Sequence, residues 1–261
     1  MTHTHNTQLN TEDHLVMLTL ELDSDSVDKL DYHKGSVMQG VLMERIDSGY
    51  ASMMHQDRPH PYSQSIRHKS GRNLWEIRTF NKDAYEHIIE PLLSDDFTSF
   101  YLKHNRADIS IVDKRLASYS AEELFYRAFH EYAGNTYELL FLTPTAFKVN
   151  KKIHFYPSIR NIYQSIMRRF DDALPGSDMY DEDRLKILID STEVVSYNIR
   201  SVKYGIEGKT IPSFMGSVTV KLKGQQEMYN FAKMLFDFGN FSGVGIKTST
   251  GMGRMEVREV K

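Results

Sequence analysis

The sequence predicts an α+β protein with two tandem ferredoxin-like (RRM-like, βαββαβ) domains. Alternating strand patterns and longer helical patterns follow the order β-α-β-β-α-β in the first half, and the same order returns in the second half. The length of 261 residues is near the size at which a single core stops growing, so two domains are expected. We expect an N-terminal domain at residues 1–132 and a C-terminal domain at 133–261.

The first half is divided by turn and breaker residues. Apolar and polar residues alternate from Leu15 and predict a strand, and Pro59 and Pro61 end the helix that follows it. Gly49 weakens the second half of that helix. The expected elements are a strand at 15–22, a helix at 35–54, strands at 62–67 and 73–80, a helix at 82–93, a strand at 97–102 with 109–112 as a candidate extension, and a connecting helix at 121–132.

The second half repeats this order without clear sequence identity to the first half. The expected elements are a strand at 137–147, a helix at 157–170, strands at 194–204 and 211–222, a helix at 225–238, and a strand at 254–259. An acidic group at 178–183 is interpreted as a solvated loop.

A glycine-rich segment, GVGIKTSTGMGR at 243–254, lies between the last helix and the last strand. Glycine adopts positive φ and has no Cβ, and free amides in such a loop form an anion-binding concavity. The order of elements excludes the dinucleotide fingerprint, and Ile246 before Lys247 excludes the Walker pattern. We expect a loop that cradles a phosphate backbone, and the alternative is a glycine-rich turn without a ligand. The expected RNA-binding residues of this loop are Gly243, Gly245, Lys247, Thr248, Ser249, Gly251 and Gly253, and Arg254 adds a further donor.

The charge distribution indicates a selective anionic partner. The net charge of −3 and the pI of about 6.4 argue against a nonspecific nucleic-acid binder. A stretch without acids nevertheless gathers basic residues, which are Lys148, Lys151, Lys152, Arg160, Arg168 and Arg169. We expect Lys151, Lys152 and Arg160 to bind RNA, and a solvated basic helix face is the alternative. Phe155, Tyr156 and Tyr163 interleave with this stretch and could stack on bases, unless they pack in the core.

Composition excludes several classes of protein. The chain has no cysteine, so it forms no disulfide, thiolate nucleophile or Cys-ligated zinc site. We expect no metal and no cofactor, because Asp23, Asp25 and Asp28 lack the calcium-loop pattern. No apolar run has membrane-spanning length and the first residues lack a signal peptide, so the cytoplasm is the expected location.

Three segments carry a resemblance to a known family. FLTPTAFKVNKKIHFYPSIRNIYQSIMRRF, IPSFMGSVTVKLKG and GVGIKTSTGMGRMEV resemble, in order and spacing, the CRISPR-associated endoribonucleases that cut precursor RNA into guide RNAs. This is the sixth Cas family, within the RAMP superfamily. The resemblance covers the C-terminal half specifically, and the N-terminal half more loosely. It implies tandem ferredoxin-like domains, recognition of CRISPR repeat RNA, and metal-independent cleavage of precursor crRNA.

The resemblance also implies a catalytic pair. The family's catalytic histidine lies at or just beyond the first helix, which His55 matches, and Tyr62 could match a tyrosine that some members place downstream. Metal-free cleavage uses the 2′-hydroxyl as nucleophile, and histidine suits the proton transfers because its pKa is near neutrality. His60 and His68 are alternatives to His55. Arg58 and Lys69 could supply cationic stabilisation.

Two other functions are compatible with the sequence. One is a noncatalytic RAMP subunit that holds guide RNA in a CRISPR effector complex, and the other is a ferredoxin-like interaction module without an RNA role. The expected partner is CRISPR repeat RNA, with a CRISPR interference complex as a further candidate. The protein is expected to be a monomer or a homodimer.

Overall fold

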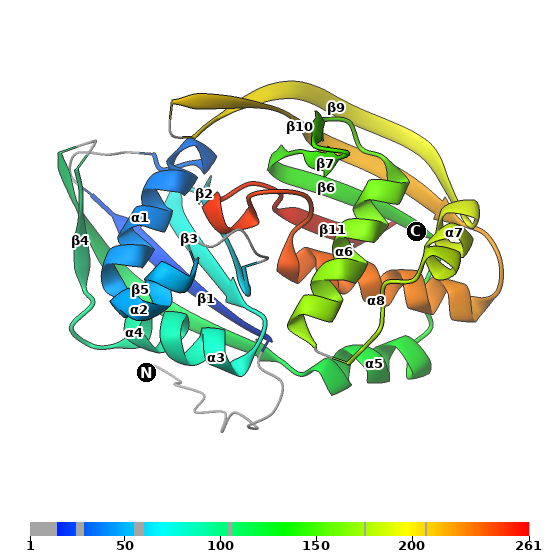
Figure 1. Cartoon of the computed structure of the whole chain (residues 1–261), viewed down its shortest axis with the longest axis horizontal. Coiled ribbons are helices and arrows are strands. Elements are labelled where there is room, and N and C mark those ends of the chain that lie inside the picture. The colour runs from blue at the N-terminus through cyan, green and yellow to red at the C-terminus, as the bar shows by residue number, and fades with distance from the viewer. Residues whose placement is uncertain are drawn as a thin grey trace.

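Two antiparallel sheets lie side by side in the computed structural model, each covered by helices (Figure 1). The structure describes residues 15–24, 29–54, 60–103, 106–174, 176–206 and 208–260. The first sheet has the strand order β2-β3-β1-β5-β4, and the second has the order β11-β6-β10-β9. The predicted fold class, two tandem ferredoxin-like domains, is confirmed.

The first sheet is centred on β1, which pairs antiparallel with β3 and β5. Its strands are β1 (Leu15–Asp23), β2 (Tyr62–Lys69), β3 (Arg72–Thr79), β4 (Ser99–Leu102) and β5 (Ala107–Tyr119). The expectation that 109–112 extends the preceding strand is wrong. The segment belongs to a separate strand of 13 residues beside β1. Its charged residues obscured it in the sequence, because they lie on faces of β5 that are largely exposed.

The helix expected at 35–54 is two helices, α1 (Gly35–Arg45) and α2 (Ser48–Met54). Ile46 is extended, and the Asp47 carboxylate accepts a hydrogen bond from the Tyr50 amide, which starts a new helix. The break therefore precedes Gly49. A 3₁₀ turn, η1 (Tyr32–Lys34), comes before α1, and the helix expected at 82–93 contains a π-helical turn. Its three parts are α3 (Lys82–Ala84), η2 (Tyr85–Ile89) and α4 (Glu90–Leu93).

The second half contains the expected elements and three additional features. Its strands are β6 (Thr136–Thr145), β7 (Phe147–Val149), β8 (Lys152–His154), β9 (Thr192–Ile206), β10 (Lys209–Leu222) and β11 (Met255–Glu259). Its helices are α5 (Ala121–His130), α6 (Ile159–Ala173), α7 (Glu182–Asp190), α8 (Gln226–Ser242) and the 3₁₀ turn η3 (Thr248–Thr250). The additions are the β7–β8 hairpin, α7 and η3.

Helix α7 corrects the interpretation of the acidic group as a solvated loop. The Asp181 carboxylate caps the helix by accepting from the Arg184 amide, and Glu182 and Asp183 occupy the first turn. Carboxylates are favourable there because the amides at a helix N-terminus carry partial positive charge.

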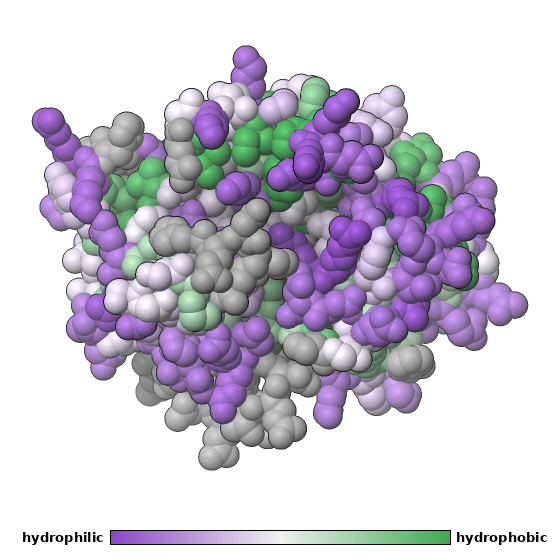
Figure 2. All heavy atoms as spheres, in the orientation of Figure 1, coloured by the Kyte–Doolittle hydropathy of each residue, from purple (hydrophilic) through white to green (hydrophobic). Residues whose placement is uncertain are grey.

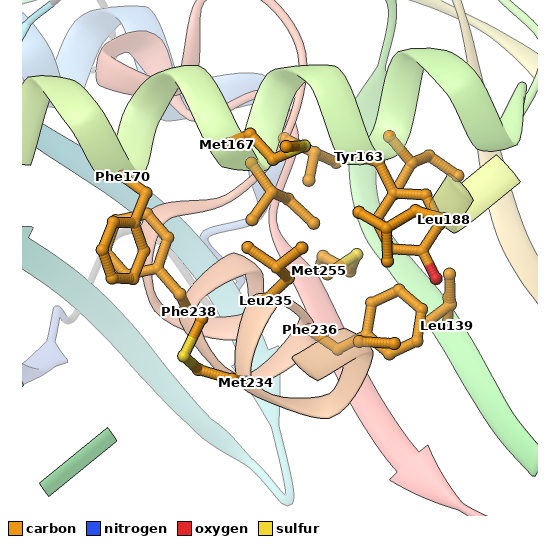
Figure 3. Close-up of a cluster of buried hydrophobic side chains, with 14 of the residues drawn as sticks. Leu139, Tyr163, Met167, Phe170, Leu188, Met234, Leu235, Phe236, Phe238 and Met255 are labelled. Carbon is orange, nitrogen blue, oxygen red and sulfur yellow. The ribbon is translucent and has the colours of Figure 1, made fainter. Parts of the chain in front are cut away.

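The core of the second half lies between α6, α8 and the sheet (Figure 3). Tyr163, Met167 and Phe170 of α6 face Leu235 and Phe238 of α8 in this cluster. Three partly buried side chains of α5 also pack against this second core, although the predicted boundary places α5 in the first domain. The division at residues 132 and 133 stays a prediction. In the described ranges, none of the helices has the length and apolar composition needed to cross a bilayer.

Candidate functional site

Tyr62 joins three elements at one end of the first sheet. It begins β2, and its side chain is completely buried. Gln39 of α1 donates a hydrogen bond to the Tyr62 hydroxyl at 3.3 Å, and Ser249 of the glycine-rich loop also bonds to it. Burial raises the pKa of the Tyr62 phenol far above its ordinary value, so the group stays protonated at neutral pH. Tyr62 is therefore built to hold α1, β2 and the loop together.

His55 and Arg58 lie outside the described residues, between the end of α2 at Met54 and the start of β2 at Tyr62. His60, the first alternative, is half-buried in the same connection. Its ring stacks on Tyr62 with centroids 5.8 Å apart and an interplanar angle of 17°. An imidazole therefore lies beside the buried phenol.

His68 and Lys69 lie at the opposite end of β2. His68 follows His60 by eight positions in the sequence, which corresponds to about 26 Å if the whole segment is extended at 3.3 Å per residue. His68 Nδ1 is 2.8 Å from Asn73 Oδ1, which also accepts from the Leu30 amide. Lys69 pairs with Arg72 across the β2–β3 turn. Lys69 and Tyr62 are at the two ends of β2, and cationic stabilisation by Lys69 stays a prediction. The His68 ring is held by its hydrogen bond to Asn73.

The glycine-rich loop has the backbone geometry that its sequence predicts. All four of its glycines have positive φ, as does Lys247 at 58°. A Cβ on Gly253 would collide with the Val244 carbonyl oxygen, and one on Gly245 would collide with that of Ala146. The glycines are required because the two arms of the loop contact each other, and the chain at the end of β6, through their backbones, which leaves no room for a Cβ.

The amides of this loop do not form the predicted open cradle. The amides of residues 243–246 and 250–254 donate to acceptors within the protein, including the Ser165 hydroxyl and the Ala146 carbonyl. Thr248 and Ser249 are buried, whereas Lys247 is exposed. The expectation that free backbone amides of this loop bind phosphate is therefore wrong for most of the segment. RNA binding by these residues stays a prediction.

The loop is packed against the first domain. Gln64 of β2 donates to the Ser249 carbonyl at 2.7 Å and accepts from the Trp75 indole at 2.6 Å. The Tyr204 hydroxyl, from the β9–β10 hairpin, donates to the Thr250 carbonyl. Gly35 at the start of α1 lies so close to the loop that a Cβ would collide with that same carbonyl. Figure 1 shows this loop in red between the two sheets.

Arg254 ends the loop in a buried ionic cluster and is unsuited to an exposed phosphate. We call this group the interdomain ion cluster, and its members are Arg67, Glu76, Arg78, Arg254 and Glu256. Burial alone would raise the pKa of Glu76, but Arg78, Arg254 and Arg67 outweigh it and lower that pKa to about 2. The cluster links β2 and β3 to the start of β11 and fixes the two domains at the base of the loop.

The predicted basic residues differ in their exposure to solvent and in whether their charges are already paired. Lys151 and Lys152 are exposed in the β7–β8 hairpin, where Asn150 and Lys151 have positive φ. Arg160 is also exposed, but its guanidinium pairs with Glu182 at 2.6 Å. Arg169 instead donates to the Gly245 carbonyl at 3.1 Å and supports the loop.

Two of the three predicted stacking residues are exposed. Phe155 and Tyr156 follow the β7–β8 hairpin and are 43% and 59% exposed, whereas Tyr163 packs in the core. Of the two alternatives for Tyr163, stacking on bases or packing in the core, the structure shows core packing. Hydrophilic surface covers the region over β7 and along α6 in Figure 2. Within the described ranges, no cluster of three His, Asp or Glu residues could hold a metal ion.

The fold and the site together define a class of protein. It has two ferredoxin-like domains, joined through a C-terminal glycine-rich loop that lies beside a basic, aromatic hairpin. Residues 139–255 match the family model of the CRISPR-associated endoribonuclease Cas6. The predicted resemblance of this chain to the CRISPR-associated endoribonucleases is confirmed.

The relatives extend this match over most of the chain. The Cas6 of Streptococcus thermophilus is 28% identical over 85% of this chain and 90% of its own length. That of Mycobacterium tuberculosis is 29% identical over 94% of this chain and 79% of its own length. Among solved structures, Thermus thermophilus Cas6 covers 95% of this chain and 100% of its own, with a TM-score of 0.71 and 20% identity. A Cas6 product complex has a TM-score of 0.76, with 20% identity over 94% of this chain and 100% of its own.

Proposed function

We propose that this protein is an endoribonuclease that binds CRISPR repeat RNA and cleaves precursor crRNA without a metal. The observation that carries the proposal is the packing of the glycine-rich loop, which lies within the family match, against α1 and β2. The connection between α2 and β2 bears His55 and His60 in the sequence and ends at Tyr62, whose hydroxyl bonds to Ser249 of the loop. His60 stacks on Tyr62, and so one candidate proton-transfer group lies beside a contact between the loop and the first sheet.

We assign the proton transfers to His55, with His60 as the alternative. The 2′-oxygen attacks the adjacent phosphorus, the P–O5′ bond breaks, and the departing 5′ oxygen takes a proton. The products carry a 2′,3′-cyclic phosphate and a 5′-hydroxyl. A histidine can accept the first proton or donate the second because both of its forms are populated near neutrality. Tyr62 is buried, so its proposed role is to hold α1, β2 and the loop in register.

We place RNA contacts on the exposed cations and aromatics of the second domain. Lys151, Lys152 and Lys247 can neutralise phosphates, while Phe155 and Tyr156 can stack on bases. Gly243, Gly245, Gly251 and Gly253 act by shaping the loop that presents Lys247, and the buried Thr248 and Ser249 fix that shape. Arg160 can join the RNA surface by exchanging Glu182 for a phosphate.

The wider setting follows from this activity. We propose that the protein acts in the cytoplasm, as a monomer or a homodimer, and hands its product to a CRISPR interference complex. The division into domains at 1–132 and 133–261 is retained in this proposal. The alternative function is a noncatalytic RAMP subunit that binds guide RNA, and a solved RAMP protein that binds different RNA substrates shares this fold with a TM-score of 0.58.

The test is incubation of the purified full chain with repeat RNA in EDTA. The proposal expects cleavage at one position with 2′,3′-cyclic phosphate ends. His55→Ala should lose about 10²–10⁴-fold in rate while it retains repeat binding. Binding without cleavage would select the noncatalytic subunit, and an upstream 3′-hydroxyl would point to attack by water. Cleavage at the wild-type rate by His55→Ala, together with loss in His60→Ala, would move the role to His60.

A further inference from the structure

Lys247 combines a fixed main chain with an exposed side chain. It is a non-glycine residue in the left-handed region, with φ of 58° and ψ of 33°. Its carbonyl accepts hydrogen bonds from the Thr250 amide at 3.0 Å, the Thr250 hydroxyl at 2.8 Å and the Met252 amide at 3.2 Å. A residue with a side chain persists in this conformation only where its surroundings determine it. The η3 turn and the residues after it therefore hold the backbone of Lys247 in place.

The charge of Lys247 is available to an anion. Its side chain is exposed, whereas the three residues of η3 that follow it are all buried. Lys247 is not among the lysines that pair with carboxylates in the described part of the chain. An ammonium group on a fixed main chain is suited to hold one phosphate at one place, because little freedom is lost when the contact forms.

Two buried side chains from other elements hold the η3 turn by its carbonyl groups. Gln64 of β2 donates to the Ser249 carbonyl at 2.7 Å, and the Tyr204 hydroxyl of β9 donates to the Thr250 carbonyl. Gln64 also donates to the Gly35 carbonyl at 3.3 Å. The single amide of Gln64 therefore joins the loop to the first residue of α1.

Only one orientation of the Gln64 amide satisfies its three partners. The Trp75 indole can only donate, and its nitrogen lies 2.6 Å from Gln64 Oε1. The Ser249 and Gly35 carbonyls can only accept, and both bond to Nε2. Gln64 is 2% exposed, so water does not replace a lost partner. A carboxylate at this position would lack both donors, and an apolar side chain would lack all three bonds.

The face of β2 that carries Gln64 also carries Tyr62. The two residues are two positions apart in the strand, so their side chains lie on the same face. The Tyr62 hydroxyl bonds to Ser249, and the His60 ring stacks on Tyr62. Gln64 therefore fixes the loop next to the phenol and the imidazole of the first domain.

We propose that Gln64 is a positioning residue for RNA cleavage. Its amide clamps the η3 turn, so that Lys247 holds a phosphate of the RNA at a fixed place relative to Tyr62 and His60. Gln64 is buried and acts on the RNA through Lys247. This inference rests on the proposed function, because it assigns to Gln64 the placement of the RNA that the site cuts.

The test is a double-mutant cycle that combines Gln64→Met with Lys247→Asn in the full chain. Met keeps an unbranched side chain but removes all three hydrogen bonds, and Asn tolerates the left-handed conformation while it removes the charge. The affinity is measured for repeat RNA with methylated 2′-oxygens, which cannot attack the phosphate. Lys247→Asn should weaken binding about fivefold or more with Gln64 present, and less than about twofold in the Gln64→Met background.

The matched control is Gln226→Met. The Gln226 amide donates to the Ala133 carbonyl and to the Asn230 side chain, both at 2.8 Å, and touches neither the loop nor α1. In this background, Lys247→Asn should weaken binding as much as it does in the wild type.

Single-turnover cleavage of unmodified repeat RNA at saturating protein separates positioning from stability. Gln64→Met and Gln64→Glu, checked to be folded at the assay temperature, should both cut about tenfold or more slowly. Glu keeps the acceptor for Trp75 but lacks both donors, so its loss of rate assigns the effect to the bonds with the loop and α1. Trp75 is the chain's only tryptophan, and its fluorescence emission reports whether its bond to residue 64 persists. Gln64→Asn, whose amide is too short to reach both carbonyls, replaces a variant that does not fold.

Three results would overturn the inference: additive effects of Gln64→Met and Lys247→Asn on affinity, cleavage at the wild-type rate by the folded Gln64 variants, or the same loss of coupling in Gln226→Met. The affinity cycle does not depend on cleavage. A wild-type protein that binds the repeat without cutting it therefore refutes the proposed enzyme activity, while the cycle still decides whether Gln64 places Lys247.

Discussion

The glycine-rich loop and the β7–β8 hairpin both carry residues predicted to bind RNA, but the structure treats them differently. Most amides of the loop are used inside the protein, and two of its three hydroxyl residues at 248–250 accept hydrogen bonds from other elements through their backbone carbonyls. The hairpin holds Lys151 and Lys152 in solvent. The difference teaches that a glycine-rich motif can mark close backbone packing between domains, while the charges that we propose to bind RNA lie on the neighbouring element.

The largest expected effect comes from Glu76, which fixes the base of the loop in the interdomain ion cluster. Glu76→Gln leaves three buried or half-buried arginines without this carboxylate and should cost about 3–5 kcal/mol of unfolding free energy. Urea unfolding measures this cost. Glu44→Gln removes an exposed ion pair to Lys103 and should cost less than about 1 kcal/mol. Equal costs would show that the cluster does not support the loop.

Acid should weaken the same cluster. The pKa of Glu76 is about 2 in the folded protein and near 4.5 when unfolded, so its stabilisation is complete above pH 4.5 and is lost as the pH falls towards 2. The shift corresponds to about 3 kcal/mol. Unfolding free energies measured between pH 6 and pH 3 should fall more steeply in the wild type than in Glu76→Gln. Parallel pH profiles would contradict the assignment.

A single methyl group should distort the loop. Gly253→Ala places a Cβ against the Val244 carbonyl at a positive φ of 72° and should cost about 2–3 kcal/mol. The control is Gly40→Ala, at an exposed helical position with open space around it, which should stabilise the protein by up to about 1 kcal/mol. If Gly253→Ala unfolds like the wild type, the loop is looser than the structure indicates.

The smallest effect on stability should come from the hairpin, where the effect on RNA binding is largest. Lys151→Gln/Lys152→Gln should change the unfolding free energy by less than about 0.5 kcal/mol. The double variant should nevertheless bind the repeat RNA more weakly. The slope of log affinity against log salt concentration should become shallower by about 0.7 for each phosphate that is no longer neutralised. Lys186→Gln, an exposed lysine on α7, is the control. An unchanged salt slope in the double variant would remove the hairpin from the RNA surface.

The fold could be predicted because most strands and helices have the hydrophobic periodicity of their type. The resemblance indicated the family. The strand β5 was largely missed because Asp113, Lys114 and Arg115 break its apolar pattern, yet pairing with β1 orders it. The helix α7 was missed because its acidic N-cap resembles a loop. These elements depend on pairing and capping partners that periodicity alone does not reveal.

The site was predicted only in part, for a physical reason. Glycine spacing indicated the positive φ angles but could not tell an open loop from a packed one, because the partners Gly35 and Gln64 are distant in sequence. Arg78 and Glu76 alternate with apolar residues on β3, a pattern typical of a solvated strand face. The second domain covers that face of β3, and the sequence around β3 does not indicate this burial.

Amide hydrogen exchange, with and without repeat RNA, tests the contrast between loop and hairpin most directly. The account predicts that the amides of 243–246 and 250–254 are already protected in the free protein and change little on binding. Those of Asn150 and Lys151, at the hairpin turn, should exchange quickly and slow when RNA binds. Fast exchange throughout the loop in the free protein, with protection only after RNA binds, would contradict the account and restore the open phosphate cradle.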